Sequence, residues 1–268
     1  MERIREFYDA YPEEDRLLTG LARLEACRTR QLIERHAGKV RATVVDIGGA
    51  AGAYALWLSE RGCTVHLLDP VQRLVAEARR RSADAAHPIA TQIVADARAL
   101  PYPTEFADIA LLLGPLYHLV AAEGRAQALS EAARVLKPGG MLFAAAMSRW
   151  AYAFHGLARD LFSDPSFAEV VAISARDGHH RGTTNSSYFT TAYFHRPDKF
   201  VDEVARAGFL IEGCYGLEGP SVMLNDFDER WADPRRRADM IYVAELLEAE
   251  PSALAISPHL LTVARKPA

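Results

Sequence analysis

Thr43-Val44-Val45-Asp46-Ile47-Gly48-Gly49-Ala50-Ala51-Gly52 is the stretch of sequence that decides the fold. It joins a β-branched run, typical of a buried strand, to a turn made of small residues. The pattern of a helix follows from Tyr54 to Arg61 and ends at Gly62. Small residues let a strand turn sharply into a helix and leave the backbone N–H groups open to a ligand. The stretch therefore predicts a strand–turn–helix unit whose turn faces a ligand.

The same alternation continues beyond this unit. The segments expected as strands are Thr64–Leu68, Gln92–Ala95, Asp108–Leu113 and Met141–Ala146, and those expected as helices are Leu74–Arg81 and Gly124–Leu136. Strands that alternate with helices at this spacing predict a parallel sheet with helices on both faces. Upstream, Leu17, Leu21 and Leu24 recur at helical spacing, so residues 1–40 are expected to form a helical cap.

The alternation lapses between residues 147 and 200, where ten of the 24 aromatic residues lie. We expect a helical insertion there, either a packing layer or the wall of a ligand cavity. A helix over Pro197–Ala207 follows, and two last strands are expected at Phe209–Tyr215 and Leu260–Ala264, with a helix over Arg237–Ala249 between them. The expected organisation is a cap (1–40), a ligand-binding core (41–146), a substrate lid (147–200) and the strands that complete the sheet (201–268).

Three aspartates, Asp46, Asp69 and Asp96, lie at the carboxyl ends of three consecutive expected strands. Open α/β sheets bind their ligands at this edge. A carboxylate at Asp69 is able to accept hydrogen bonds from both hydroxyls of a ribose, and Asp96 from the amine of an adenine. The pattern indicates an adenosine-type ligand.

The glycine turn distinguishes between two kinds of nucleotide site. Gly48, Ala50 and Ala53 stand where the dinucleotide fingerprint has its three glycines, so only the first position matches. The pattern acidic-x-Gly-x-Gly-x-Gly fits Asp46, Gly48, Ala50 and Gly52 with only the middle glycine replaced. The second pattern is favoured.

At this point the chain resembles the class I S-adenosylmethionine-dependent methyltransferases. Val44–Gly52 is similar to their first motif, Asp69 to their ribose-binding acid, Val94–Ala97 to their adenine-side motif, and Arg134–Gly140 to the segment before their fifth strand. The resemblance covers residues 40–146 and, more loosely, the rest of the chain. It implies an α/β, doubly wound, Rossmann-like fold with a mostly parallel seven-stranded sheet, an N-terminal helical cap and a helical insertion after the fifth strand. It also implies S-adenosylmethionine as cofactor and S-adenosylhomocysteine as product.

The resemblance assigns roles to individual residues. The Gly48 backbone, supported by Asp46, would meet the methionine amino group, and the loop from Leu113 to His118 would run beside the methionyl end. Tyr8 and Tyr11 would belong to a helix that folds over the cofactor. The expected cofactor-binding residues are Tyr8, Tyr11, Asp46, Gly48, Gly49, Ala50, Gly52, Asp69, Pro70, Asp96, Ala97, Leu113 and Gly114.

In methyl transfer the protein mainly aligns the acceptor with the methyl group and excludes water, because the cofactor already carries an activated methyl group. A general base helps a hydroxyl or a protonated amine, whereas a carboxylate acceptor needs none. His118 is the first candidate base, Tyr117 a positioning hydroxyl and His195 a reserve base. For each of the three, packing in a loop or lid is the alternative interpretation.

Composition excludes several classes of protein. The 268 residues are 50% hydrophobic and 25% charged, with a net charge of −4, which gives no global attraction to nucleic acid or anionic membranes. Three separated cysteines and the spacing of the histidines predict neither a disulfide framework nor a metal site. With no signal-peptide pattern and no apolar run long enough to cross a bilayer, we expect a cytoplasmic protein. We expect it to be a monomer or a homodimer.

The resemblance implies a methyltransferase that modifies a small molecule or a peptide on oxygen or nitrogen, including a carboxylate, and that serves specialised metabolism. Two other interpretations stay open. One is a protein that binds S-adenosylmethionine without catalysis. The other, disfavoured by Ala50 and Ala53, is a nicotinamide-dependent oxidoreductase.

Overall fold

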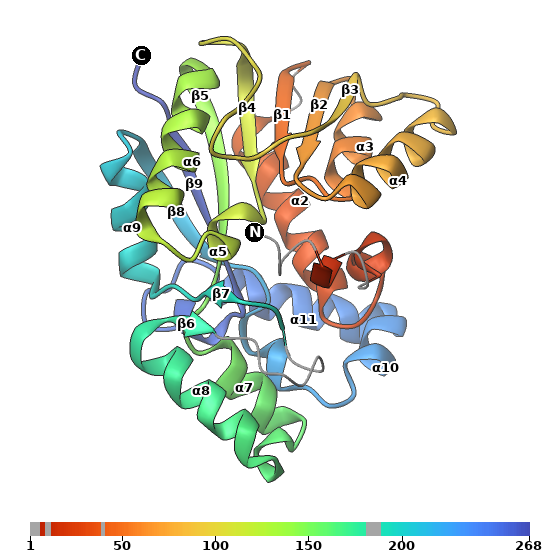
Figure 1. Cartoon of the computed structure of the whole chain (residues 1–268). Coiled ribbons are helices and arrows are strands. Elements are labelled where there is room, and N and C mark those ends of the chain that lie inside the picture. Colours follow the sequence, from red (N-terminus) through yellow and green to blue (C-terminus); the bar gives the residue numbers. More distant parts are fainter. Residues whose placement is uncertain (1–5, 9–11, 39–40, 181–188) are drawn as a thin grey trace.

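A seven-stranded sheet with the strand order β3-β2-β1-β4-β5-β9-β8 runs through the centre of the molecule (Figure 1). The computed structural model describes residues 6–8, 12–38, 41–180 and 189–268. The strands from β3 to β5 are parallel, and β9 is antiparallel to both β5 and β8. The strands are β1 (Thr43–Ile47), β2 (Thr64–Asp69), β3 (Thr91–Val94), β4 (Ala107–Leu112), β5 (Leu136–Met147), β8 (Leu210–Gly216) and β9 (His259–Arg265). The predicted mostly parallel, seven-stranded sheet is confirmed.

Helices cover both faces of this sheet, which confirms the doubly wound arrangement. One core cluster packs Leu129 of α6 and Phe200 of α9 on one face, and a second packs Leu32 of α2, Leu58 of α3 and Ala78 of α4 on the other. These helices are α2 (Ala22–Ala37), α3 (Ala53–Ser59), α4 (Gln72–Ala83), α6 (Ala122–Val135) and α9 (Pro197–Arg206). The remaining helical segments of the described chain are η1 (Glu13–Leu18), α5 (Pro115–His118), α7 (Ala151–Ala158), η2 (Leu161–Ser163), α8 (Pro165–Asp177), η3 (Gly219–Met223), α10 (Phe227–Ala232), α11 (Pro234–Leu247) and η4 (Leu254–Ile256).

Strand β5 begins five residues earlier than the apolar pattern indicates, directly at the end of α6. Its pairing with β4 passes from Ala107–Leu136 to Ile109–Met141, so a bulge accommodates the intervening residues. A Cβ on Gly140 would lie 2.8 Å from the Lys137 carbonyl oxygen, which explains why a glycine stands in this bulge. The Lys-Pro-Gly-Gly segment is therefore part of the strand and not a loop before it.

The segment after β5 contains the expected helices, α7 and α8, and in addition a short antiparallel pair, β6 (His179–His180) with β7 (Ala192–Tyr193). Together they lie beyond the edge at which β4 ends, on the side where α5 is found (Figure 1). A two-residue strand is too short to leave an alternating pattern in the sequence, which is why β6 and β7 were not expected. Among the described helices, none is both long and apolar enough to cross a membrane.

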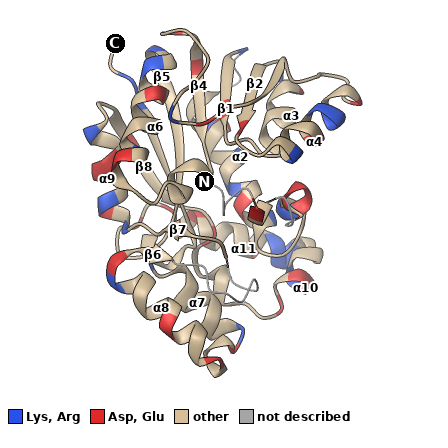
Figure 2. Ribbon diagram, viewed as in Figure 1, with Lys and Arg blue, Asp and Glu red and all other residues tan. Residues whose placement is uncertain are grey.

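Acidic and basic residues are interspersed over the outer helices in the view of Figure 2. Many of them form ion pairs that hold the N-terminal helices in place. Arg73 and Arg81 of α4 bond Glu14 and Asp15 of η1, and the buried Arg28 of α2 bonds Glu245 of α11 at 2.7 Å. The N-terminal cap is thereby bonded to α4, near the start of the chain, and to α11, near its end.

A buried charge network joins this cap to the last strand. Arg16 of η1 donates two hydrogen bonds to Glu25 of α2, at 2.6 and 3.0 Å. Glu25 lies 3.7 Å from the ring nitrogen Nδ1 of His259, which also bonds Glu218. Burial alone would lower the pKa of His259, but the charges of Glu25 and Glu218 raise it to about 9. With a charged imidazole the two acids and two bases of the network balance.

The helix α7 packs so closely on α8 at Gly156 that even a methyl group has no room. A Cβ there would lie 2.1 Å from Phe167, whose ring is fully buried and stacked on Tyr152. We expect Gly156→Ala to lower the free energy of unfolding by about 1–3 kcal/mol. Gly124→Ala in α6 is the matched control, because its nearest neighbour would be 3.7 Å away; it should be neutral or stabilising. Thermal unfolding of the two variants checks this, and equal melting temperatures would contradict the close packing.

The raised pKa of His259 predicts a stability that depends on pH. A group whose pKa is higher in the folded state contributes fully below its unfolded pKa, here near 6.5, and loses that contribution as pH rises through about 9. The difference in unfolding free energy between wild type and His259→Gln should therefore shrink between pH 6.5 and 9, by on the order of 2 kcal/mol. Urea titrations at several pH values measure it. His66→Gln, at a histidine bonded to Thr91 away from the network, should show no such trend, and a constant difference for His259→Gln would mean that His259 is neutral.

Candidate functional site

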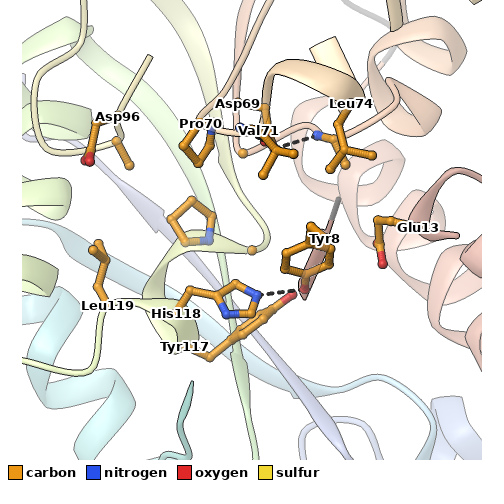
Figure 3. A pocket seen from close by; sticks show the side chains of 15 residues that line it. Tyr8, Glu13, Asp69, Pro70, Val71, Leu74, Asp96, Tyr117, His118 and Leu119 are labelled. Atoms are coloured by element: carbon orange, nitrogen blue, oxygen red, sulfur yellow. Dashed lines mark hydrogen bonds between the residues drawn. The ribbon is translucent and has the colours of Figure 1, made fainter. Parts of the chain in front are cut away.

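A pocket lies where β1, β2, β3 and β4 end, between these strands, α5 and the N-terminal segment (Figure 3). Its empty space, counted together with the solvent at its open mouth, is about 680 Å³. Ten of the residues predicted for the site line it: Tyr8, Gly48, Ala50, Asp69, Pro70, Asp96, Ala97, Gly114, Tyr117 and His118. The structure thus brings together residues from four strand ends and from the cap.

Five further residues complete the lining: Pro115, which lies in the predicted loop from Leu113 to His118, and four that sequence reasoning missed, Glu13, Val71, Leu74 and Leu119. Val71 and Leu74 follow Pro70 at the start of α4, so the end of β2 was the signal that could have identified them. Pro115 and Leu119 flank the predicted residues of α5. Glu13 left no signal, because an acid in a polar helix is ordinarily solvated.

The glycine turn has the left-handed backbone that its residues allow. Gly48 has φ +74°, and Ala50, at φ +46°, takes a conformation that favours glycine. A Cβ on Gly48 would lie 2.7 Å from the Pro115 ring, so a glycine is needed for α5 to pack on the turn. The Ala50 N–H donates to Asp69 at 3.0 Å, which offsets part of the strain at this alanine. The Gly48 and Gly49 N–H groups donate to the Leu68 carbonyl oxygen, at 2.8 and 3.1 Å. The prediction that the backbone N–H groups of the turn stay open to a ligand is therefore wrong for these three residues.

Asp69 ends β2 and holds two backbone segments at once. Its Oδ2 accepts from the Ala50 N–H and its Oδ1 accepts from the Val71 N–H at 2.8 Å. Burial raises the pKa of Asp69 to about 6, against the lowering effect of these two hydrogen bonds. Each carboxylate oxygen keeps a second lone pair, so Asp69 is able to accept ligand hydroxyls without releasing the turn.

Asp46 lies behind the turn and does not line the pocket. It is buried beneath Gly49, where a Cβ would come within 2.6 Å of its Oδ2. That oxygen has no hydrogen-bond partner within the described part of the chain. Burial and the neighbouring charge of Asp69 raise the pKa of Asp46 to about 7. The site therefore holds excess negative potential that a cationic ligand would relieve.

Asp96 lies at the opposite end of the pocket from Tyr8 (Figure 3), and the next residue, Ala97, also lines the pocket. Asp96 is two residues beyond β3 and accepts two hydrogen bonds from the Arg98 guanidinium, at 2.9 and 2.7 Å. Its carboxylate is partly exposed, with the apolar side chain of Leu119 facing it across the pocket. A flat base would find an acceptor and apolar contacts here.

Tyr8, Tyr117 and His118 form the other end of the pocket. The Tyr8 hydroxyl and the His118 Nε2 are 2.8 Å apart. Burial lowers the pKa of His118 to about 3, although the nearby Thr191 backbone acts in the other direction, so its imidazole is neutral at physiological pH. Burial raises the pKa values of Tyr8 and Tyr117, which keeps both hydroxyls protonated.

Several predicted residues are not in the pocket lining. His195 is buried elsewhere, with its Nε2 2.9 Å from Glu203 of α9, and burial lowers its pKa. The position of His195 therefore favours the packing interpretation over that of a reserve base. Gly49, Gly52 and Leu113 support the turn from behind, and Tyr11 lies outside the described residues.

One group of described residues has the spacing of metal ligands, namely Glu25, Glu218 and His259. The imidazole of His259 already lies between the two carboxylates, and Arg16 occupies the outer side of Glu25. A divalent cation would have to displace a proton and leave a net positive charge in a buried place. The donor set thus fits an internal ion-pair network better than a metal.

The residues of the pocket fit the cofactor that the sequence resemblance implies. From one end to the other, the lining offers the acceptor and apolar contacts at Asp96 and Leu119, the Asp69 carboxylate, the bare turn at Gly48, and the acid Glu13. These features suit a flat base, a ribose and a cationic amino-acid tail in that order. The unpartnered Oδ2 of Asp46, which lies directly behind the turn, is consistent with positive charge at that end.

Comparisons with known proteins agree with this fit. A family model described as a methyltransferase domain matches residues 45–144. The ubiquinone/menaquinone biosynthesis C-methyltransferase UbiE of Acidiphilium cryptum is 27% identical over 222 residues, which are 81% of this chain and 86% of that protein.

Solved structures show the same fold at low sequence identity. The 1,6-didemethyltoxoflavin-N1-methyltransferase of Burkholderia thailandensis, bound to 1,6-didemethyltoxoflavin and S-adenosylhomocysteine, has a TM-score of 0.61 at 15% identity and covers 100% of this chain and 88% of its own. A possible histamine N-methyltransferase of Thermotoga maritima has a TM-score of 0.60 at 17% identity and covers 99% and 98%. The matched domain and the relative along most of the chain, together with the shared fold, support a class I S-adenosylmethionine-dependent methyltransferase with S-adenosylmethionine as its cofactor.

Proposed function

We propose that this methyltransferase modifies a small molecule that binds beside Tyr117 and His118. The observation that carries the proposal is the pocket itself. It runs from Asp96 to a buried end lined by an imidazole and two phenols, and Tyr8 and Glu13 of the N-terminal segment form part of its lining. The toxoflavin methyltransferase of similar fold binds a small heterocycle in its own structure, which supports an acceptor of this size.

In this proposal the cofactor contacts follow the lining of the pocket. Asp69 accepts the ribose hydroxyls, Asp96 and Ala97 flank the adenine, and the Gly48 backbone faces the methionyl tail. The acid Glu13 lies at the same end, and burial raises its pKa although Arg16 opposes this effect. An ammonium group on the ligand would favour the charged form of Glu13, so we assign it to the methionine amino group together with Asp46.

The cofactor supplies an activated methyl group on a sulfonium when bound. The chain's own part is to align the acceptor, to exclude water and to take up a proton if the acceptor has one. His118 is neutral and has a ring nitrogen facing the pocket, so we assign it as the base. The Tyr117 hydroxyl lies 3.7 Å from where a Gly114 Cβ would stand, which places it against the turn as a positioning group.

Closure of the pocket depends on the N-terminal segment. Arg73 of α4 donates to the Tyr8 carbonyl oxygen at 2.7 Å and to the Glu14 carboxylate at 3.0 Å. These contacts hold the segment over the end of the pocket that Tyr8 and Glu13 line. We propose that residues 1–40 act as the lid of the cofactor and residues 147–200 as the wall of the acceptor site.

We further propose that this enzyme is cytoplasmic, serves specialised metabolism, acts as a monomer or homodimer and has no nucleic-acid partner. The interspersed charges of Figure 2 and the net charge of −4 support a substrate other than nucleic acid. A peptide acceptor stays as the alternative to a small molecule, because the pocket mouth is open.

Titration calorimetry with S-adenosylmethionine, S-adenosylhomocysteine and NADH tests the cofactor site. We expect the two adenosyl ligands to bind and NADH to give no heat. Asp69→Ala should weaken adenosyl binding at least tenfold, about 1.4 kcal/mol, because it removes the ribose acceptor and frees the turn.

Asp108→Ala is the control for that titration. Asp108 also accepts from a backbone N–H, that of Thr43 at 2.8 Å, but it lies near the start of β4, at the opposite edge of the sheet. Its binding should match wild type. Binding of NADH alone would contradict the proposed function and favour an oxidoreductase.

The raised pKa of Asp46 predicts that this carboxyl lowers the stability of the free protein as pH rises from mildly acidic to neutral. The folded carboxyl keeps its proton up to about pH 7, whereas the unfolded one loses it near 3.8, so folding stability falls as pH rises between these values. Asp46→Asn removes this ionisation, and its unfolding free energy should fall less steeply from pH 4.5 to 7. Chemical denaturation without ligand measures both slopes. Equal slopes would show that Asp46 ionises normally.

A further inference from the structure

Five rings from three separate parts of the chain meet at the buried end of the pocket. We call them the ring cluster: Phe7 and Tyr8 of the N-terminal segment, Tyr117 and His118 of α5, and Phe189. The His118 ring lies 5.3 Å from Tyr8, 4.6 Å from Tyr117 and 5.6 Å from Phe189, measured between centroids. Phe189 is also 5.9 Å from Phe7, in an edge-on contact. The imidazole is thus surrounded by aromatic rings on several sides.

Within the ring cluster, we assign the Tyr8 hydroxyl as the donor and the His118 Nε2 as the acceptor of their 2.8 Å contact. Both pKa shifts, upward for Tyr8 and downward for His118, keep the proton on the phenol. An acceptor at Nε2 requires the neutral ring to carry its proton on Nδ1. The nitrogen that faces the pocket is therefore the one able to receive a proton.

We propose that the Tyr8 side chain occupies the place of the methyl acceptor, and that the acceptor is a planar molecule whose aromatic or enolic hydroxyl bonds His118 in its stead. The inference deepens the proposed function and rests on it. The Tyr8–His118 contact shows that a phenol ring and its hydroxyl fit this place with good geometry, at 2.8 Å. Because Tyr8 is not part of the sheet, its displacement breaks its contacts with His118 and Arg73 but leaves the strand pairing intact.

The charges around the ring cluster select against other acceptors. The carboxylates of Glu13 and Asp69 act on Tyr8 and would repel a carboxylate acceptor. The cation that acts on the same residues, Arg16, already bonds Glu13 at 2.9 Å and Glu25 with its two other nitrogens. A neutral ring loses little solvation free energy when it enters this place, whereas an anion would lose its hydration and find no cation to pair with.

The weak basicity of His118 selects among hydroxyls. A phenol has a pKa near 10, as for tyrosine, and gives up its proton far more readily than an aliphatic alcohol. In the step, the acceptor oxygen forms a bond to the methyl carbon while the carbon–sulfur bond breaks and leaves its electron pair on sulfur. The proton of the acceptor passes to the His118 Nε2, so the positive charge moves from sulfur to the imidazole and the balance is kept.

The test uses the full chain loaded with S-adenosylhomocysteine and four small probes of similar size: 4-methylphenol, toluene, 4-methylcyclohexanol and 4-methylbenzoate. Binding is measured by ligand-observed NMR titration, which needs no turnover. We expect 4-methylphenol to bind at least fivefold more tightly than each of the others. Transfer of a labelled methyl group to the two hydroxyl probes gives a second readout, in which the phenol should be the better acceptor.

Two variants separate the roles of the ring and the hydroxyl. Tyr8→Phe keeps the ring but removes the competing hydroxyl, so 4-methylphenol should bind more tightly than to wild type, by about threefold or more. His118→Phe keeps the aromatic packing but removes the acceptor nitrogen, so the preference for 4-methylphenol over toluene should vanish. His66→Phe, at a histidine bonded to Thr91 outside the pocket, is the control and should leave every affinity unchanged.

The outcomes distinguish this inference from the proposed function. Failure of S-adenosylhomocysteine to bind would overturn the proposed function itself. Normal binding of S-adenosylhomocysteine, with 4-methylphenol no tighter than toluene or with the preference intact in His118→Phe, would overturn the hydroxyl-acceptor inference alone. Tighter binding of 4-methylbenzoate than of the phenol would do the same and identify a carboxylate acceptor.

Discussion

The site depends on one interaction, the acceptance of two backbone N–H groups by the Asp69 carboxylate. One N–H belongs to Ala50 in the turn after β1 and the other to Val71 at the start of α4. A single side chain therefore fixes the distance between two strand ends and the backbone conformation of the turn. Because Ala50 has a left-handed φ without being a glycine, the turn relies on this bond more than an all-glycine turn would. The ligand-binding edge is rigid at the place where a ribose is expected.

The molecule treats buried charge in two different ways. In the network of Glu25, Glu218, His259 and Arg16, each acid faces a base, and the group stabilises the junction of cap and sheet. Behind the pocket, Asp46 faces no base. Its raised pKa reflects the free energy needed to ionise a carboxyl group that is buried and close to Asp69. An imbalance that persists beside an open pocket is typical of a binding site, because a ligand is able to supply the missing charge. In this protein, the buried acids that face a base serve stability, and the buried acid that faces none lies beside the proposed ligand site.

Sequence was sufficient for the core of the fold and for the cofactor edge, because both are local. Alternating strands and helices fix the sheet, and the three aspartates mark strand ends whatever follows them. It was insufficient where long-range packing decides. Nothing in the sequence pattern shows that Glu13 faces the pocket or that His195 turns away from it toward Glu203. The bulge in β5 likewise depends on its register with β4.

The acceptor end combines three chain segments whose sequence separation exceeds 60 residues, joined by contacts of Tyr8 and Phe189 with His118. No sequence motif predicts this contact, since none of the three segments has a distinctive pattern of residues by itself. The cofactor edge, in contrast, is built on consecutive strands. In such a fold, substitutions in the cap and in the insertion are expected to alter the choice of acceptor without altering cofactor binding. The reason is that the cap and the insertion contribute Phe7, Tyr8 and Phe189 to the ring cluster, whereas the glycine turn follows β1. The specificity of this enzyme is therefore expected to reside in Phe7, Tyr8 and Phe189, and its common chemistry in Asp69 and the turn it holds.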